Sequence, residues 1–164
     1  MGAAQLAGAA LGAGLLRAGA GAEALGGCVT RAPSLRPAAA AAVEALLGGC
    51  LALLNCASWD PRVASLRDSW PLRVGLSVAG LTLAGGDLTG ASMNPARSFG
   101  PALCAGDWAH HWVYWVGPLS GSALFTGMYV LMWRPRDWRP RHDAPPENKA
   151  PLPASAPHKL HRSV

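Results

Sequence analysis

The chain has 164 residues, of which 51% are hydrophobic and only 14% are charged. In soluble domains about a quarter of the residues are charged. This composition therefore argues against an ordinary soluble domain and favours a membrane protein. The net charge of +5 comes mostly from residues 134–164, where seven basic residues stand against three acidic ones.

Apolar segments of suitable length predict an all-α membrane protein. A helix of about 20 apolar residues crosses about 30 Å of hydrocarbon. One charge, Glu44, interrupts the second segment, and the fourth contains no Asp, Glu, Lys or Arg. We expect one membrane domain over residues 1–133, with four transmembrane helices at about 3–20, 38–57, 71–84 and 111–133.

The first segment is expected to be a retained membrane helix. Its first basic residue, Arg17, follows the apolar run, whereas a signal peptide has its basic residues ahead of the run. Ala4, Gly8 and Gly12 recur at i, i+4 spacing, a pattern that lets helix backbones approach closely in a bilayer. The pattern is common and on its own does not establish a helix contact.

A short helix is predicted over residues 94–104, between the third and fourth segments. Asn94 is a good N-cap, and Pro95 suits the first helical position. The segment is too short to cross a membrane, so we interpret it as a re-entrant half-helix. Irregular backbone at membrane depth is tolerated where it is buried in protein or lines a water-filled cavity.

The run Asn94, Pro95, Ala96, Arg97 predicts the chemistry of this half-helix. Its N-terminus carries about half a positive charge, and Arg97 adds a full one a turn further on. The Asn94 amide is able to donate to a water oxygen, while the two positive charges repel cations and protons. The alternative is a surface helix that begins at Asn94 and carries a solvated Arg97.

Several stretches around this run resemble the second half of the aquaporins. The likeness covers about residues 3–133 and is strongest from 75 to 118. Residues 83–86 and 111–118 favour the aquaporin-8 type within the family. The stretches that carry the likeness are 75–78, 87–90, 94–101 and 112–118.

The resemblance implies a role for each residue of the loop. Asn94, with Pro95 and Ala96, would be one of two paired motifs at the pore centre. Arg97 and Thr82 would line the outer constriction, and Ala91 would supply backbone to it. Because Thr82 and Ala91 are small, the resemblance implies a roomy filter for water, and for ammonia or hydrogen peroxide.

Glu44 lies where the family places a buried glutamate in its fourth helix. It is about one and a half turns inside its segment, so we prefer a buried carboxylate to one that snorkels to the membrane surface. There it would accept hydrogen bonds from loop backbone and support the pore loop.

The family is built from two inverted halves, each with an Asn-Pro-Ala motif, whereas this sequence holds one such motif. We expect the second repeat plus the last helix of the first. The hypothesis is a channel for water and small neutral solutes, incomplete as given. The alternative is a non-conducting membrane subunit or fragment that associates with a full-length aquaporin.

The remaining expectations concern partners and location. The sequence has no nucleophile elbow, zincin motif or P-loop, so we expect no enzyme, cofactor or metal site. The partners are a lipid bilayer, the solutes and, by resemblance, three further copies in a tetramer. The proline-rich tail 134–164 is predicted to be disordered and cytoplasmic, and we prefer this to nucleic-acid binding because its basic run directly follows an apolar segment.

Overall fold

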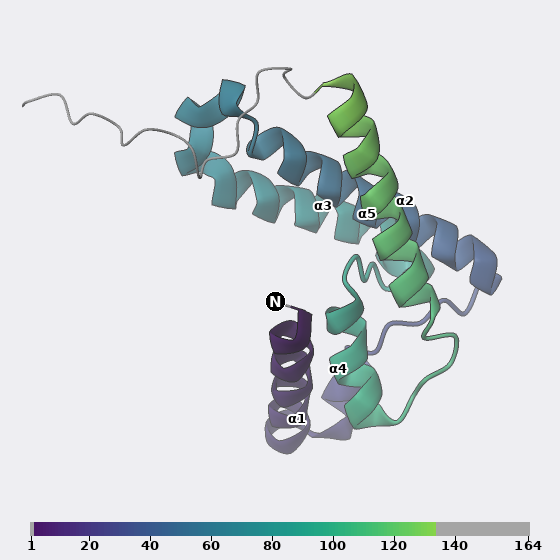
Figure 1. Ribbon diagram of the computed structural model, residues 1–164. Helices are drawn as coiled ribbons and strands as arrows, with labels where there is room; N and C mark the ends of the chain where they lie inside the picture. The colour runs from purple at the N-terminus through teal and green to yellow at the C-terminus, as the bar shows by residue number, and fades with distance from the viewer. Residues whose placement is uncertain (1, 134–164) are drawn as a thin grey trace, which may run out of the picture. The chain divides into compact units, whose positions relative to one another are not determined.

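The computed structural model describes residues 2–133, apart from the side chains of residues 64–67 (Figure 1). Within this part every regular element is helical, and none is a strand. The predicted tail 134–164 lies outside the described residues. The elements in chain order are α1 (Gly2–Gly26), α2 (Pro37–Ser58), the 3-10 helix η1 (Pro61–Ser69), α3 (Trp70–Thr89), α4 (Pro95–Ala105) and α5 (Val113–Met132).

Two helices extend beyond the segments expected from the sequence. The helix α1 continues past residue 20, although Gly21 has a φ of 88° that breaks its regularity. The helix α3 continues past residue 84 to Thr89 and ends where Gly90 adopts a left-handed φ of 81°. Gly85 and Gly86 therefore do not end α3, because glycine weakens a helix by about 1 kcal/mol per residue without stopping it. Length and composition mark α2 as the one helix of residues 2–133 that is long and apolar enough to cross a membrane.

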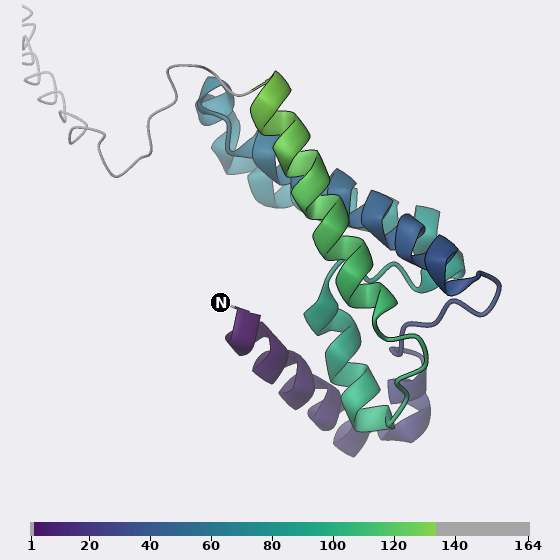
Figure 2. The same cartoon turned by 45° about the vertical axis from the view of Figure 1, so that its right-hand side comes forward.

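The helices α2 and α5 pack along much of their length, and glycines allow the close approach (Figures 1 and 2). A Cβ atom placed on Gly121 would lie 1.8 Å from the Ala45 carbonyl oxygen. A Cβ atom on Gly117 would lie 2.8 Å from the Ala41 carbonyl oxygen. Small residues at a helix interface let the two backbones come into van der Waals contact, which is how helices associate within membranes.

The helix α1 lies beside α4, and the two views agree on this arrangement (Figures 1 and 2). The contact forms where a Cβ atom on Gly100 would lie 2.3 Å from the Ala9 carbonyl oxygen. Gly8 and Gly12 of the stripe take no part in this contact within the described residues, because a Cβ on Gly8 or Gly12 would meet nothing within 4 Å. The spacing identifies a face of α1 that is made of small residues, but it does not show which face of α1 packs against α4.

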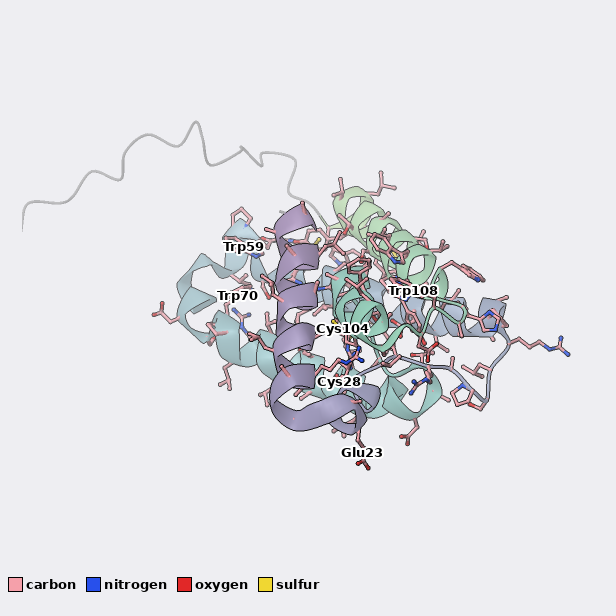
Figure 3. All side chains as sticks on the ribbon, turned by 90° about the horizontal axis from the view of Figure 1, so that it is seen from below. Glu23, Cys28, Trp59, Trp70, Cys104 and Trp108 are labelled. Atoms are coloured by element: carbon pink, nitrogen blue, oxygen red, sulfur yellow. The ribbon has the colours of Figure 1, made fainter. Side chains whose placement is uncertain are left out.

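A polar cluster joins the start of η1 to the end of α5. Arg62 donates to both carboxylate oxygens of Asp60, at 2.9 and 2.7 Å, and to the Trp133 carbonyl at 2.9 Å. The Tyr129 hydroxyl also donates to Asp60. The hydrogen bonds from Arg62 and then Tyr129 hold the pKa of Asp60 well below its usual range. Close by, the rings of Trp59 and Trp70 meet edge to face, with centroids 5.8 Å apart (Figure 3).

Candidate functional site

The candidate site is the loop of residues 90–94 and the start of α4. Gly90 follows the last residue of α3 and has a φ of 81°. Ala91 and Met93 also have positive φ values, of 43° and 53°. Left-handed backbone is uncommon outside glycine and costs energy, so the surrounding structure must hold these residues in place. Ala91 is buried, with 4% of its surface exposed.

Asn94 caps α4 as the sequence predicts. Its side-chain oxygen accepts the backbone N–H of Ala96 at 3.0 Å, and its carbonyl accepts the N–H of Arg97 at 3.1 Å. Pro95 occupies the first helical position, where it has no N–H to leave without a partner. The cap uses the oxygen of the Asn94 amide and leaves its NH2 group, which is a donor, out of the cap.

Glu44 supports this loop from α2. Its carboxylate is fully buried, and one oxygen accepts the Thr89 hydroxyl at 2.7 Å and the Ser92 N–H at 2.8 Å. The other oxygen accepts the Met93 N–H at 2.8 Å. The burial and the loop hydrogen bonds expected of Glu44 are therefore both present. A carboxylate that accepts several N–H and O–H groups compensates for its removal from water.

A row of buried hydroxyl groups forms a second support, which the sequence analysis does not predict. The Thr30 hydroxyl donates to Ser98 at 2.8 Å, and the Ser98 and Ser92 oxygens are 2.6 Å apart. Ser92 in turn donates to the Asn94 carbonyl at 2.9 Å. Serine and threonine have no spacing rule for such pairs, and Thr30 is 68 residues from its partner.

Arg97 lies on the exposed side of α4, and its guanidinium donates to the Cys28 carbonyl at 2.5 Å. Thr82 is exposed on α3, and in the described residues no hydrogen bond joins it to Arg97. The structure thus brings Glu44, Ala91, Asn94 and Arg97 around one loop, whereas Thr82 has no described hydrogen bond to this group.

A second cation lies at the opposite end of α4. Arg17 of α1 donates to the Cys104 carbonyl, in the last turn of that helix. A positive charge is favourable there, because the carbonyl end of a helix is negative. Figure 3 labels Cys28, in the segment after α1, and Cys104, near the end of α4.

An ion pair lies just after α4, where Arg31 pairs with Asp107 at 2.8 Å. The hydrogen bonds from Arg31 and from the Ala109 N–H lower the pKa of the Asp107 carboxyl.

A groove of about 370 Å³ opens beside the first turn of α4. Asn94 and Pro95 line it, so the capped N-terminus of the helix faces this space. Its walls come from the start of α1, from α2 and from α5. The remaining lining residues are Gly2, Gln5, Leu6, Leu51, Met93, Ala96, Trp115, Pro118, Leu119 and Ser122.

Comparison with known proteins identifies relatives of this chain by sequence. A family model described as "Major intrinsic protein" matches residues 2–129. "Probable aquaporin TIP4-2" of Oryza sativa subsp. japonica is 51% identical over 136 residues, which are 80% of this chain and 51% of that protein. "Aquaporin TIP4-1" of Arabidopsis thaliana is 56% identical over 78 residues, 46% of this chain and 31% of that protein.

The chain spans about half the length, or less, of these curated relatives. "Probable aquaporin TIP3-2" of Arabidopsis thaliana matches in the same way, at 46% identity over 92 residues, 56% of this chain and 34% of that protein. These relatives carry TIP names, so the finer expectation of an aquaporin-8 type is not supported.

Proposed function

The chain belongs to the major intrinsic protein family, and from this premise we propose that it forms part of a membrane channel for water and small neutral solutes. Membership of the family makes it an integral membrane protein, and the family consists of channels rather than enzymes. The observation that carries the proposal is the N-terminus of α4, which is capped by Asn94 and faces an open groove.

The proposed chemistry follows from Asn94, which lines the groove, and from Arg97, which follows the lining residue Ala96 in α4. The Asn94 NH2 group offers hydrogen bonds to a passing oxygen, while the positive end of α4 and the Arg97 guanidinium repel cations. Pro95 and Ala96 form the first turn that holds Asn94 in place. Glu44 accepts the N–H groups of the loop, and its bonds to Ser92 and Met93 support the left-handed backbone there.

The remaining assignments belong to the same proposal. The family resemblance assigns Thr82 and Ala91 to the outer constriction, where their small side chains suit ammonia or hydrogen peroxide as well as water, although no hydrogen bond among the described residues joins Thr82 to Arg97. The helix α2 crosses the membrane by its own length and composition, and the proposal places α1, α3 and α5 across the membrane beside it, with α4 as a re-entrant half-helix. The basic segment that follows residue 133 lies on the cytoplasmic side, and the protein assembles as a tetramer.

Stopped-flow osmosis on proteoliposomes tests the proposal. Vesicles that contain the purified chain should shrink faster than protein-free vesicles, and Asn94→Ala should remove most of the gain. Asn55→Ala is a matched control, because Asn55 donates to the Leu51 carbonyl within α2 and is not part of the loop. Equal rates with and without protein would reject conduction by this chain.

The open groove favours a second candidate function, a non-conducting subunit that associates with a full-length aquaporin. Loop backbone at membrane depth needs a protein or aqueous neighbour. A partner seated against Asn94 and Pro95 would supply it. Co-purification with a full-length relative in mild detergent tests this candidate, and failure to associate would count against it.

A further inference from the structure

The segment of residues 28–30, between α1 and α2, binds α4 at two neighbouring positions. The Cys28 carbonyl accepts the Arg97 guanidinium at 2.5 Å. The Thr30 hydroxyl donates to Ser98, the next residue of α4, at 2.8 Å. Thr30 and Ser98 are both buried, with 6% and 0% of their surfaces exposed, whereas Arg97 is exposed. The buried hydrogen bond between Thr30 and Ser98 thus lies directly beside the exposed hydrogen bond that the charged Arg97 makes to Cys28.

Thr30 is also fixed from its other side. A Cβ atom on Gly90 would lie 3.2 Å from the Thr30 Cα, so Thr30 packs closely on the residue that ends α3. Gly90 has a positive φ, and any other residue there would be strained as well as crowded. Thr30 is therefore held between the end of α3 and the first turn of α4.

The direction of the hydroxyl hydrogen bonds makes Thr30 the first donor of the row. A hydroxyl group has one proton to donate. The proton of Ser92 goes to the Asn94 carbonyl, so Ser92 must accept from Ser98. The proton of Ser98 is then used, and Ser98 accepts from Thr30. Without the Thr30 hydroxyl, the buried Ser98 oxygen loses the donor that links it to the segment 28–30.

Arg97 needs such a link because its own side chain does not fix its position. An exposed arginine has many rotamers and loses considerable entropy when one of them is selected. An acceptor orders the guanidinium only if the acceptor itself is held still. The Cys28 carbonyl belongs to a segment between helices, and the Thr30–Ser98 bond holds that segment against α4 two residues away.

We propose that Thr30 is a positioning residue for Arg97: its hydrogen bond to Ser98 holds the segment 28–30 so that the Cys28 carbonyl orders the guanidinium. The importance of this ordering for solute selection rests on the proposed function. The ordering itself is a property of the fold and can be measured whether or not the chain conducts.

Solid-state NMR of the full chain in lipid bilayers tests the proposal. With 15N-labelled arginine and 13C-carbonyl-labelled cysteine, two contacts between described residues give a nitrogen–carbon dipolar coupling: Arg97 with Cys28, and Arg17 with Cys104. The second contact is an internal reference for the packing of α1 on α4. A Cys104→Ser sample removes that coupling and assigns the two signals.

Three variants separate the hydroxyl from the shape of Thr30. Thr30→Val keeps the packing on Gly90 and should lose the Arg97–Cys28 coupling while it keeps the Arg17–Cys104 coupling. Thr30→Ser keeps the hydroxyl and should keep both couplings. Thr126→Val is a matched control on α5, because the Thr126 hydroxyl accepts a weak 3.8 Å contact from the Cys56 thiol and lies outside the hydroxyl row, and it should keep both couplings.

The other outcomes contradict the proposal. If Thr30→Val keeps both couplings, the hydroxyl does not order Arg97. If Thr30→Val loses both, the change disturbs the packing of α4 in general rather than Arg97. Loss of the Arg97–Cys28 coupling in Thr30→Ser would show that the hydroxyl is not sufficient. None of these measurements depends on water permeability. A failure of the proposed function is therefore distinguished from a failure of this inference.

Discussion

The carboxylate of Glu44 accepts the backbone N–H of Met93 at 2.8 Å, which ties α2 to a loop 49 residues away in the sequence. Met93 has a positive φ of 53° and directly precedes the cap residue Asn94. A fully buried acceptor thus compensates for strained backbone at the point where α4 begins.

Glu44→Gln should destabilise the protein although it preserves the size of the side chain. A glutamine has one acceptor oxygen, so its NH2 group would face either the Met93 N–H or the Thr89 and Ser92 donors. A buried donor without an acceptor costs about 1–3 kcal/mol. We expect a lower unfolding temperature in detergent, measured by circular dichroism.

Glu23→Gln is the control for that substitution, because Glu23 is exposed on α1. It should leave the unfolding temperature close to that of the unmodified chain. An equal, small effect of both substitutions would contradict the account of Glu44.

How far the sequence predicts this site depends on the range of each interaction. The start of α4 at Asn94 is predictable because the N-cap and the proline act within one turn. Thr30 is not, because the hydroxyl row joins segments distant in sequence and leaves no periodic signal. The same holds for Gly100, whose contact with Ala9 depends on which face of α1 meets α4.

Gly121→Ala should separate α2 from α5. The added methyl group would lie 1.8 Å from the Ala45 carbonyl oxygen, and backbone cannot move aside as a flexible side chain does. Overpacking of this kind costs about 1–3 kcal/mol. Thermal unfolding in detergent should show the loss. Gly127→Ala, on the same helix, meets nothing within 4 Å and should be neutral or slightly stabilising. Equal stability of the two variants would show that the glycine contact does not limit the packing.

Acid should weaken the attachment of η1 to α5. Because Arg62 and Tyr129 lower the pKa of Asp60 in the folded protein, the carboxylate contributes stability above the ordinary carboxyl pKa. That contribution should decline as the pH falls below about 4–5, since the unfolded chain takes up the proton first. Unfolding temperatures measured across this range should fall less steeply in Asp60→Asn. The exposed Asp87, changed to Asn, is the control and should keep the slope of the unmodified chain.

Arg97→Ala should increase the passage of cations and protons through a conducting form. The substitution removes the full positive charge beside the N-terminus of α4 and leaves the weaker charge of the helix itself. Proton flux into proteoliposomes, followed with an entrapped pH-sensitive dye, should rise relative to water flux. Arg36→Ala changes an arginine outside α4, in the residue before α2, and should not alter that ratio. An unchanged ratio in Arg97→Ala would remove Arg97 from the barrier to cations.

The depth of Met93 in a lipid bilayer tests the central claim most directly. A spin label at Met93, in a chain whose four cysteines are replaced by serine, should lie within the hydrocarbon layer. A water-soluble relaxation agent should nevertheless reach it through the groove beside Asn94. Labels at Leu46, exposed on α2, and at Ala109, exposed after α4, give the deep and shallow references. A Met93 label at the depth of the Ala109 label would place the loop on the membrane surface and contradict the channel account.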